Sequence, residues 1–270
     1  MTEQPHRNVD LAGLTRMDGR GVVVLGVGGE GMGTATARLL AAAGAKVMCV
    51  DIREDLARAV AEEIGGEPHV ADVTDRRAME ALFARADALF GDRFSGVVDI
   101  VGQATGGNLA SFDDGTIERL FAGNLRHALL TVQIAGPMLA ARGGGSMVFV
   151  GSLAGAAVSP GQAIYAVAKA GLHHLVRHAA DEYGPRGVRA NVVAPGIILT
   201  AGVRAVAPPA ALEKIAGDTP LRRVGQPQDV ANTIYFLTSD LSAYVTGSVI
   251  YVDGGTMTGA NLPRMGAPEP

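Results

Sequence analysis

Short apolar runs alternate with alanine-rich amphipathic stretches along the chain, and this alternation limits the possible folds more than any other feature. The apolar runs are rich in Val, Ile and Met and lack alternating polar residues, which is typical of parallel strands buried on both faces. The expected strands are residues 21–26, 46–51, 68–71, 97–102, 146–151, 189–194 and 249–252. The expected helices include residues 31–43, 53–63, 76–90, 117–141, 163–183 and 228–237. Because crossovers between parallel strands are right-handed, this order predicts an α/β fold with a doubly wound parallel sheet of about seven strands.

The chain length suits one large domain. At roughly 150 residues per domain, 270 residues allow one or two domains, and no repeat or low-complexity linker divides the chain. We expect a single Rossmann-type domain over residues 19–255, preceded by an N-terminal extension (1–18) and followed by a C-terminal tail (256–270), both peripheral or frayed. A hydrophobic content of 48% excludes a disordered protein.

Charge and cysteine content exclude several classes of partner. A formal net charge of −4 provides no basic face, so we expect no nucleic acid partner. The single cysteine, Cys49, excludes a disulfide framework and a multi-cysteine zinc site, and it fits a reducing compartment. No apolar run is long enough to span a membrane, and residues 1–18 lack the apolar core of a signal peptide. We therefore expect a soluble, cytoplasmic protein.

A glycine-rich turn follows the first expected strand and leads into the first helix. Gly26, Gly28 and Gly31 have the spacing G-x-G-x-x-G. A side chain here would hold a pyrophosphate away from the N–H groups at the helix N-terminus, so such a binding turn needs glycine. The pattern occurs in plain tight turns too, but its position favours cofactor binding, with Met32 and Gly33 completing the site.

An acidic residue, Asp51, ends the second strand 20 residues after Gly31. A carboxylate there accepts hydrogen bonds from both ribose hydroxyls and repels a 2′-phosphate, so we favour NAD over NADP. The alternative is that Asp51 caps the helix that follows Arg53. Ile52 is expected in the same adenosine pocket.

Asp72 and Val73 end the third strand, where an adenine ring would lie. Asp72 would reach the exocyclic amine and Val73 would pack on the ring. A plain turn cap is an equally good interpretation of Asp72.

Tyr165 and Lys169 are four residues apart, which places them on one face of a helix. A nearby positive charge stabilises the phenolate and lowers the tyrosine pKa, so Tyr165 is a candidate proton shuttle between an alcohol and a ketone. Ser152 follows the fifth strand, so its hydroxyl is expected at the carboxyl edge of the sheet, where such folds bind ligands. Taken alone, a Tyr-x-x-x-Lys pair carries almost no information, because many helices contain one.

Further motifs give this pair its weight. They are the glycine turn, Asn124-Leu125, Ser152 thirteen residues before Tyr165, Pro195-Gly196-x-x-x-Thr200, residues 220–231 (PLRRVGQPQDVA) and residues 245–255 (VTGSVIYVDGG). In these motifs and their order, residues 19–255 resemble the short-chain dehydrogenase/reductase family.

The resemblance implies a role for each matching residue. Tyr165 would be the catalytic acid/base, and Ser152 would hold the substrate oxygen. Lys169 would bind the nicotinamide ribose and lower the pKa of Tyr165, and Asn124 would hold a water that relays protons through Lys169. The nicotinamide carboxamide would be positioned by Pro195, Gly196, Ile198 and Thr200. The resemblance also implies a homodimer or homotetramer that needs no metal.

The chain departs from the family pattern at two places. Gly26-Val27 stands where the family has Thr-Gly, and Gln103-Ala104-Thr105-Gly106 stands where it has Asn-Asn-Ala-Gly. The β-branched Val27 disfavours a positive φ, so we expect the turn to use Gly26 and Gly28. The family's threonine and asparagine, which are polar partners, are both replaced here, so no hydrogen-bond donor is left without an acceptor. We therefore interpret the two changes as a coordinated variant of the cofactor pocket and not as the loss of the pocket.

Gln103 and Gly106 are expected beside the cofactor. Gly106 leaves room for the nicotinamide ribose. The alignment with the family's Asn-Asn-Ala-Gly segment is uncertain by one residue, so either Gln103 or Gly102 occupies the position of its first asparagine.

The expected substrate walls carry few charges. Relatives place a mobile lid over residues 197–217, where Arg204 is the only charged residue before Glu213. Residues 153–164, on the other wall, have none. These walls favour a lipophilic substrate, unless they face the core or another subunit.

Three histidines carry less weight. His174 and His178 have a spacing that can bind zinc, but without a third ligand we interpret them as packing or interface residues. His127, one turn after Asn124, is interpreted as structural.

The sequence therefore predicts an NAD(H)-dependent oxidoreductase that interconverts a secondary alcohol and a ketone on a lipophilic small molecule, mainly in the direction of oxidation. One alternative is an NADPH-dependent ketoreductase of the 3-oxoacyl type, which a basic lid and a small residue at position 51 would favour. Another is a non-catalytic Rossmann scaffold or ligand sensor, supported only by Val27 and Gln103. An enoyl reductase is disfavoured, because such relatives space Tyr and Lys more widely.

Overall fold

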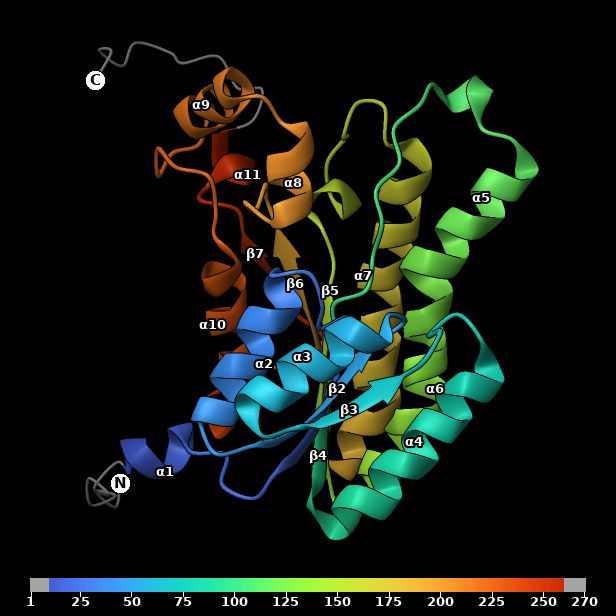
Figure 1. Ribbon diagram of the computed structural model, residues 1–270, viewed down its shortest axis with the longest axis vertical. Coiled ribbons are helices and arrows are strands. Elements are labelled where there is room, and N and C mark those ends of the chain that lie inside the picture. The colour runs from blue at the N-terminus through green and yellow to red at the C-terminus, as the bar shows by residue number, and fades with distance from the viewer. Residues whose placement is uncertain (1–9, 260–270) are drawn as a thin grey trace, which may run out of the picture.

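The apolar runs pair into one parallel sheet, and the computed structural model describes residues 10–259 of the chain (Figure 1). The strand order is β3-β2-β1-β4-β5-β6-β7, and every neighbouring pair is parallel. The strands are β1 (Gly21–Leu25), β2 (Lys46–Asp51), β3 (Glu67–Val70), β4 (Phe94–Asp99), β5 (Gly145–Val150), β6 (Val188–Pro195) and β7 (Val249–Val252). The predicted doubly wound α/β fold is confirmed.

Helices cover both faces of this sheet (Figure 1). The main helices are α2 (Met32–Ala42), α3 (Glu54–Ile64), α4 (Arg76–Phe90), α6 (His127–Ala141), α7 (Ala163–Tyr183) and α10 (Pro227–Thr238). Alternate residues of β1 serve the two cores: Val23 and Leu25 pack towards α4, α6 and α7, whereas Val22 and Val24 pack towards α2, α3 and α10. Both layers are apolar, which explains strands without polar alternation. Among the described residues, no helix is long and apolar enough to cross a membrane.

Strand β4 begins and ends three residues earlier than predicted, at Phe94 and Asp99 rather than 97 and 102. Phe94 is a buried core residue that joins the sheet, which accounts for the early start. At the other end the Asp99 carboxylate accepts a hydrogen bond from the Val101 N–H (3.2 Å), which turns the chain out of the ladder. Strand β3 is likewise displaced by one residue.

The predicted helix over residues 117–141 is divided in three. It comprises α5 (Asp114–Phe121), a π-helical turn (Ala122–Arg126) and α6. Such π turns are rare and often occur at functional sites. Here the turn contains Asn124, whose side chain is fully buried.

The N-terminal extension is docked where it is described. The short helix α1 (Leu11–Thr15) is followed by Met17, which is fully buried in the core. The Tyr235 hydroxyl of α10 donates a hydrogen bond to the Thr15 carbonyl, and Arg20 pairs with Asp240. In the described part of the extension, α1 has no buried residue and is peripheral, whereas Met17 after it is buried against the core. Residues 1–9 and 260–270 of the predicted peripheral ends lie outside the described residues.

The strand order places the site. Strands β1 and β4 are neighbours, but their following segments lead to opposite faces of the sheet, so a crevice opens where these segments diverge. The glycine turn follows β1, and residues 100–113 follow β4. Ligand-binding groups are expected here, at the carboxyl edge.

We predict that Gly33→Ala destabilises the fold strongly. An added Cβ would lie 2.0 Å from the Gly26 carbonyl oxygen and 2.8 Å from the Val27 Cα, both in backbone that packs helix against strand. We expect a loss of about 3 kcal/mol in the free energy of unfolding, measured by urea denaturation. Gly217→Ala is the control, because an added Cβ meets nothing within 4 Å there. Equal urea midpoints for both variants would contradict this account of the turn.

Candidate active site

The glycine turn brings backbone N–H groups to the carboxyl edge of the sheet. Gly26 and Gly29 have φ values of 84° and 81°, whereas Val27 is not among the residues with positive φ. Use of Gly26 is confirmed, but Gly29 rather than Gly28 supplies the second left-handed position. Gly28 is needed for a different reason: it donates its N–H to Asp51 Oδ2 (2.9 Å), and a Cβ there would lie 2.8 Å from the same oxygen.

Glu30 is the acidic member of this turn, and the sequence analysis missed it. It is exposed and adopts a left-handed conformation (φ 49°), which is uncommon for a residue with a side chain. Next to it, Gly31 is the N-cap of α2, and Met32 begins the helix. A carboxylate therefore lies at the entrance to the helix N-terminus.

Asp51 is held in place by backbone groups. Besides the Gly28 N–H, its carboxylate accepts the N–H of Arg53 (3.0 Å), which is the N-cap residue of α3. The guanidinium of Arg53 forms an ion pair with Asp55 (2.5 Å). Ile52, beside Asp51, is exposed. The bond to the Arg53 N–H supports the interpretation of Asp51 as a cap of α3. The bond to the Gly28 N–H shows that the same carboxylate also holds the glycine turn in place.

The third strand ends in a capped turn. Asp72 Oδ1 accepts hydrogen bonds from the N–H (2.9 Å) and hydroxyl (2.7 Å) of Thr74, as the turn interpretation expects. Val73 is 8% exposed and packs in the core, which leaves little of its side chain for an adenine ring.

Asn124 clasps the segment after β4. Its Oδ1 accepts the Gln103 N–H, and its Nδ2 donates to the Gln103 carbonyl, both at 2.9 Å. The same Nδ2 also donates to the Leu120 carbonyl. A Cβ added to Gly102 would lie 2.8 Å from Lys169 Nζ and 3.2 Å from Asn124 Oδ1, while Gln103 is bonded to Asn124, so both residues lie beside this pair.

Tyr165 and Ser152 face each other near this edge. A hydrogen bond from Ser152 lowers the pKa of Tyr165, but burial raises it more, so the net shift is upward. The expectation that Lys169 lowers the tyrosine pKa is not met, because Lys169 Nζ lies 5.8 Å from the ring centroid and desolvation dominates. Ser152 also caps a short turn, since its Oγ accepts the Ala154 N–H (3.1 Å).

Lys169 is buried, with 1% of its surface exposed. Its Nζ donates to the Val150 carbonyl at 2.9 Å and lies 3.5 Å from the Val101 carbonyl, so it links the ends of two strands. Burial lowers its pKa to about 8, and the charge of Asp99 opposes that shift.

His173, one helical turn after Lys169, is a site residue that the sequence analysis missed in favour of its neighbour His174. Its Nε2 accepts the Ser152 N–H at 3.5 Å. It fills the space that Gly151 and Gly155 leave open, where an added Cβ would lie 2.3 Å and 2.6 Å from the ring. Its spacing of four from Lys169 is the signal that was available. His174 and His178 form an edge-to-face pair with centroids 4.9 Å apart.

The segment after β6 passes close to the glycine turn. Pro195 ends the strand, and the Gly196 N–H donates to the Val252 carbonyl (3.0 Å). Ile198 is buried, and Thr200 is the N-cap of α8 (Ala201–Val206). A Cβ added to Gly31 would lie 3.9 Å from Thr200 Cγ2, so the two predicted cofactor segments meet here.

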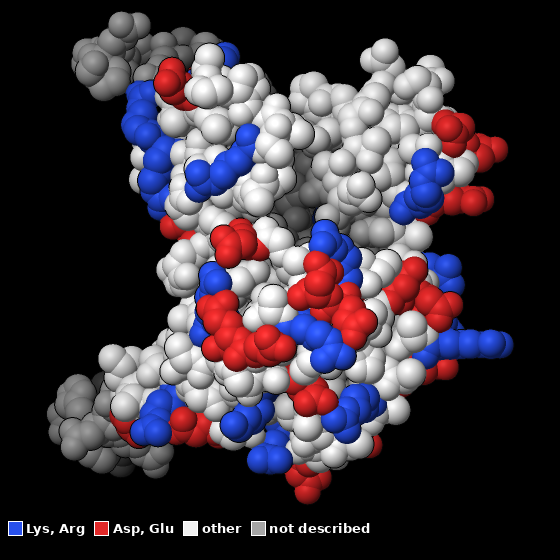
Figure 2. Space-filling view, viewed as in Figure 1, with Lys and Arg blue, Asp and Glu red and all other residues white. Residues whose placement is uncertain are grey.

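Figure 2 shows a cleft between the lobe of α8 and α9 (Pro209–Asp218) and the lobe that contains α5, and few charges line this view of it. Large apolar side chains are exposed in the segments at this end of the molecule: Leu109 (68%), Val158 (91%) and Val206 (81%). The predicted lid (197–217) thus forms two short helices.

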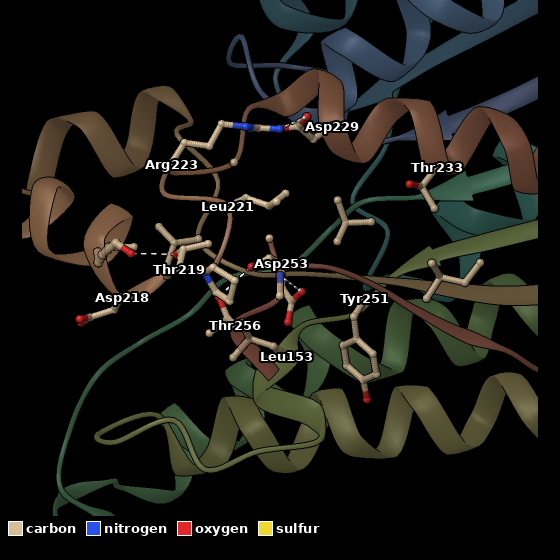
Figure 3. A pocket seen from close by; sticks show the side chains of 18 of the residues that line it. Leu153, Asp218, Thr219, Leu221, Arg223, Asp229, Thr233, Tyr251, Asp253 and Thr256 are labelled. Carbon is tan, nitrogen blue, oxygen red and sulfur yellow. Dashed lines mark hydrogen bonds and ion pairs between the residues drawn. The ribbon is translucent and has the colours of Figure 1, made fainter. Parts of the chain in front are cut away.

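A pocket of about 780 Å³ lies behind the lid, bounded by α9, α10 and β7 (Figure 3). Leu153 and Ile197 border it, and an ion pair between Arg223 and Asp229 (2.6 Å) closes one side. Its lining does not include Ser152, Tyr165 or Lys169, so it is separate from the candidate catalytic groups.

We predict that His173 makes stability depend on acid pH. Burial lowers its pKa from 6.5 to about 4, so the unfolded chain binds more protons between these values. The free energy of unfolding therefore falls as pH decreases through this range. His173→Gln keeps an acceptor for the Ser152 N–H but does not titrate, and it should reduce the acid loss by up to about 3 kcal/mol in urea titrations at pH 7 and pH 4. Identical acid losses in both proteins would refute the assignment.

The comparisons with known proteins agree with this geometry. A family model described as enoyl-(acyl carrier protein) reductase matches residues 26–257. The 7alpha-hydroxysteroid dehydrogenase of Escherichia coli K12 is 35% identical, with 89% of this chain and 95% of that protein covered. Galactitol 2-dehydrogenase of Cereibacter sphaeroides is 34% identical (92% and 98% covered), and the 3-oxoacyl-[acyl-carrier-protein] reductase of Thermotoga maritima is 33% identical (89% and 98%).

A solved structure gives the same picture. The 7 alpha-hydroxysteroid dehydrogenase complexed with NADH and 7-oxo glycochenodeoxycholic acid superposes with a TM-score of 0.86 at 31% identity, over 92% of this chain and 98% of that chain. Motifs, fold and relatives agree, and the chain belongs to the short-chain dehydrogenase/reductase family of alcohol and ketone oxidoreductases.

Proposed function

We propose that this enzyme interconverts a secondary alcohol and a ketone on a lipophilic small molecule, with NAD(H) as its cofactor and Tyr165 as the acid/base. The observation that carries the proposal is the meeting of Tyr165, Ser152 and the buried Lys169 at the carboxyl edge, next to the open glycine turn. The proposed enzyme acts in the cytoplasm as a homodimer or homotetramer.

The backbone at the start of α2 fits a dinucleotide. Gly28 and Gly33 are positions that a Cβ would fill with contacts of 2.5 Å and 2.0 Å, and Gly31 leaves the helix N-terminus open towards Thr200. A pyrophosphate would be held there by N–H groups and the helix dipole. When bound, a nicotinamide cofactor supplies or accepts the hydride.

The chain's own residues handle the proton. In oxidation, the Tyr165 oxygen accepts the proton of the substrate hydroxyl, and in reduction it returns that proton to the carbonyl oxygen. Ser152 donates a hydrogen bond to the same substrate oxygen. The Lys169 ammonium lies 5.8 Å from the centroid of the Tyr165 ring, where it would bind the nicotinamide ribose. Asn124 keeps the adjacent backbone in register through its two bonds to Gln103.

Two carboxylates support NAD over NADP. Asp51 is fixed at the end of β2 by the Gly28 and Arg53 N–H groups, where a ribose is expected. Glu30 adds a second negative charge on the turn. The nearby Arg53 is already paired with Asp55. The two carboxylates would repel the 2′-phosphate of NADPH, which disfavours the NADPH-dependent ketoreductase. One relative is nevertheless named as a 3-oxoacyl-[acyl-carrier-protein] reductase.

The apolar rims support a lipophilic substrate. Val158 and Val206 are almost fully exposed, which costs stability in water unless a ligand or partner covers them. Three relatives are named 7alpha-hydroxysteroid dehydrogenase, and one solved structure is that enzyme complexed with NADH and 7-oxo glycochenodeoxycholic acid, which supports a substrate of the steroid kind.

We predict that Tyr165→Phe abolishes turnover and leaves NADH affinity within about twofold, because the variant loses only the hydroxyl that moves the proton. Turnover is measured with NAD and a panel of lipophilic secondary alcohols, and affinity by calorimetric titration. Val167→Ala, an exposed residue of the same helix, is the control. Residual turnover above a few per cent of wild type would remove Tyr165 from the acid/base role.

We predict that Asp51→Ala shifts the cofactor preference towards NADP. The wild type should bind NADH more tightly than NADPH, and loss of the carboxylate should reduce that ratio by about tenfold or more. Glu30→Gln should reduce it in the same direction but less, because Glu30 is exposed. Calorimetric titration with each nucleotide gives the ratio. An unchanged ratio in Asp51→Ala would end this assignment, and tighter NADPH binding by wild type would favour the ketoreductase.

A further inference from the structure

An acidic group is buried directly beneath the candidate proton relay. Asp99, the last residue of β4, is 1% exposed. Its Oδ2 lies 2.8 Å from His127 Nδ1 and accepts a hydrogen bond from Thr131 Oγ1 (3.3 Å), while its Oδ1 accepts the Val101 N–H (3.2 Å). His127 and Thr131 are themselves buried. Burial of three polar side chains costs free energy unless they form hydrogen bonds with one another. The position of this group inside the fold therefore needs an explanation.

The segment that Asp99 fixes supports both relay groups. Val101, whose N–H bonds Asp99, offers its carbonyl to Lys169 Nζ. Two residues on, Gln103 is clasped by the Asn124 side chain through its N–H and its carbonyl. Residues 101–103 are therefore a shelf shared by the lysine and the asparagine, and Asp99 anchors the end of that shelf.

His127 anchors the other side. It follows the π-helical turn that contains Asn124, so its position sets where that turn ends. Its Nδ1 lies 2.8 Å from the Asp99 carboxylate, which favours the tautomer with the proton on Nδ1, whereas its Nε2 has no hydrogen-bond partner among the described residues. An apolar side chain would avoid that unpaired nitrogen but would leave the buried Asp99 carboxylate without this partner, so the contact with Asp99 accounts for the histidine.

The charges around Lys169 point the same way. The titratable groups that act on it or face it are Tyr165 and His173 from its own helix and Asp99 from β4. Asp99 is the one that raises the pKa of Lys169, against the lowering by burial, and Lys169 in turn lowers the pKa of His173. A carboxylate under the lysine thus favours its charged form.

We propose that Asp99 and His127 are positioning residues for the proton relay: Asp99 fixes the shelf 101–103, which Lys169 contacts, and His127 ties the Asn124 turn to the same carboxylate. This assignment rests on the proposed function for its catalytic meaning, but its geometric content can be measured without substrate. It gives a role to two residues that touch neither substrate nor cofactor.

The first test uses the alkaline stability of the intact protein. Since the pKa of Lys169 is lowered from 10.5 to about 8, the unfolded chain binds more protons between these values, and the free energy of unfolding rises with pH in that window. Lys169→Met should lack this rise. In Asp99→Asn, which keeps the shape of the side chain, the rise should begin about one pH unit lower. Asp240→Asn, which removes a carboxylate paired with Arg20 at the opposite edge, is the matched control and should keep the wild-type onset.

The second test separates positioning from bulk stability. His127→Leu removes the donor to Asp99, and His127→Asn restores a donor near the Nδ1 position. Hydrogen exchange of the Gln103 amide should speed up about tenfold in His127→Leu and return towards wild type in His127→Asn. With an active substrate, the same pair should show a loss and a recovery of kcat, while KM changes by less than about twofold.

The proposal is overturned if the free energy of unfolding of Asp99→Asn begins to rise at the same pH as that of wild type. It is also overturned if the exchange rate of the Gln103 amide is the same in His127→Leu and wild type. If a single variant does not fold, the double variant Asp99→Asn with His127→Leu is measured in its place. It contains no buried carboxylate that lacks a partner. A double variant with wild-type onset and exchange would assign the pair to packing alone, again overturning the proposal. Failure of the proposed function looks different: wild type would not turn over alcohols, while both substrate-free readouts would still give their answer.

Discussion

A buried ammonium group organises the carboxyl edge of this sheet. Lys169 has 1% of its surface exposed, so its charge must be compensated by groups within reach. The carbonyl oxygens of Val150, at the end of β5, and of Val101, two residues after β4, supply dipoles, and Asp99 supplies the opposite charge. A Cβ on Gly102 would lie 2.8 Å from the lysine nitrogen, so a side chain there would displace Lys169 from its present position. The positions of strand ends, loop and helix α7 are thus all tied to one charge.

The parallel sheet makes this arrangement possible. Only where neighbouring strands end at the same edge can one lysine contact carbonyl oxygens from two of them, and the order β1-β4-β5 brings the glycine turn beside that point. The π-helical turn then delivers the Asn124 side chain to the segment after β4, whereas a regular α-helix would rotate its residue away from that segment. The π-helical turn is thus the backbone irregularity that brings Asn124 to the proposed site.

The sequence predicted the elements that depend on local patterns. Buried strands, amphipathic helices and the glycine turn each carry their own periodicity or spacing, and helix α7 was predicted to the residue. What it missed depends on long-range contacts. The end of β4 is fixed by a bond from Asp99 to Val101, and the break in the long helix by contacts around Asn124, neither of which has a hydrophobic period. His173 looked no different from its neighbour His174, because only the fold reveals which of them faces Ser152.

One departure from the family pattern, Gly26, lies against the segment that leads from β4 to the other departure at residues 103–106. Gly26, which replaces a threonine, faces Val101, since a Cβ on it would lie 3.2 Å from the valine side chain. The Ile100 N–H still bonds the Leu25 carbonyl (3.1 Å), so the backbone link between turn and strand is kept while the polar side-chain link is gone. The contact between Gly26 and Val101 is apolar, whereas Gln103, the first residue of the second departure, is held by the Asn124 side chain. The glycine turn is therefore joined to β4 by backbone bonds and apolar contact, and a different polar side chain fixes the changed segment after β4.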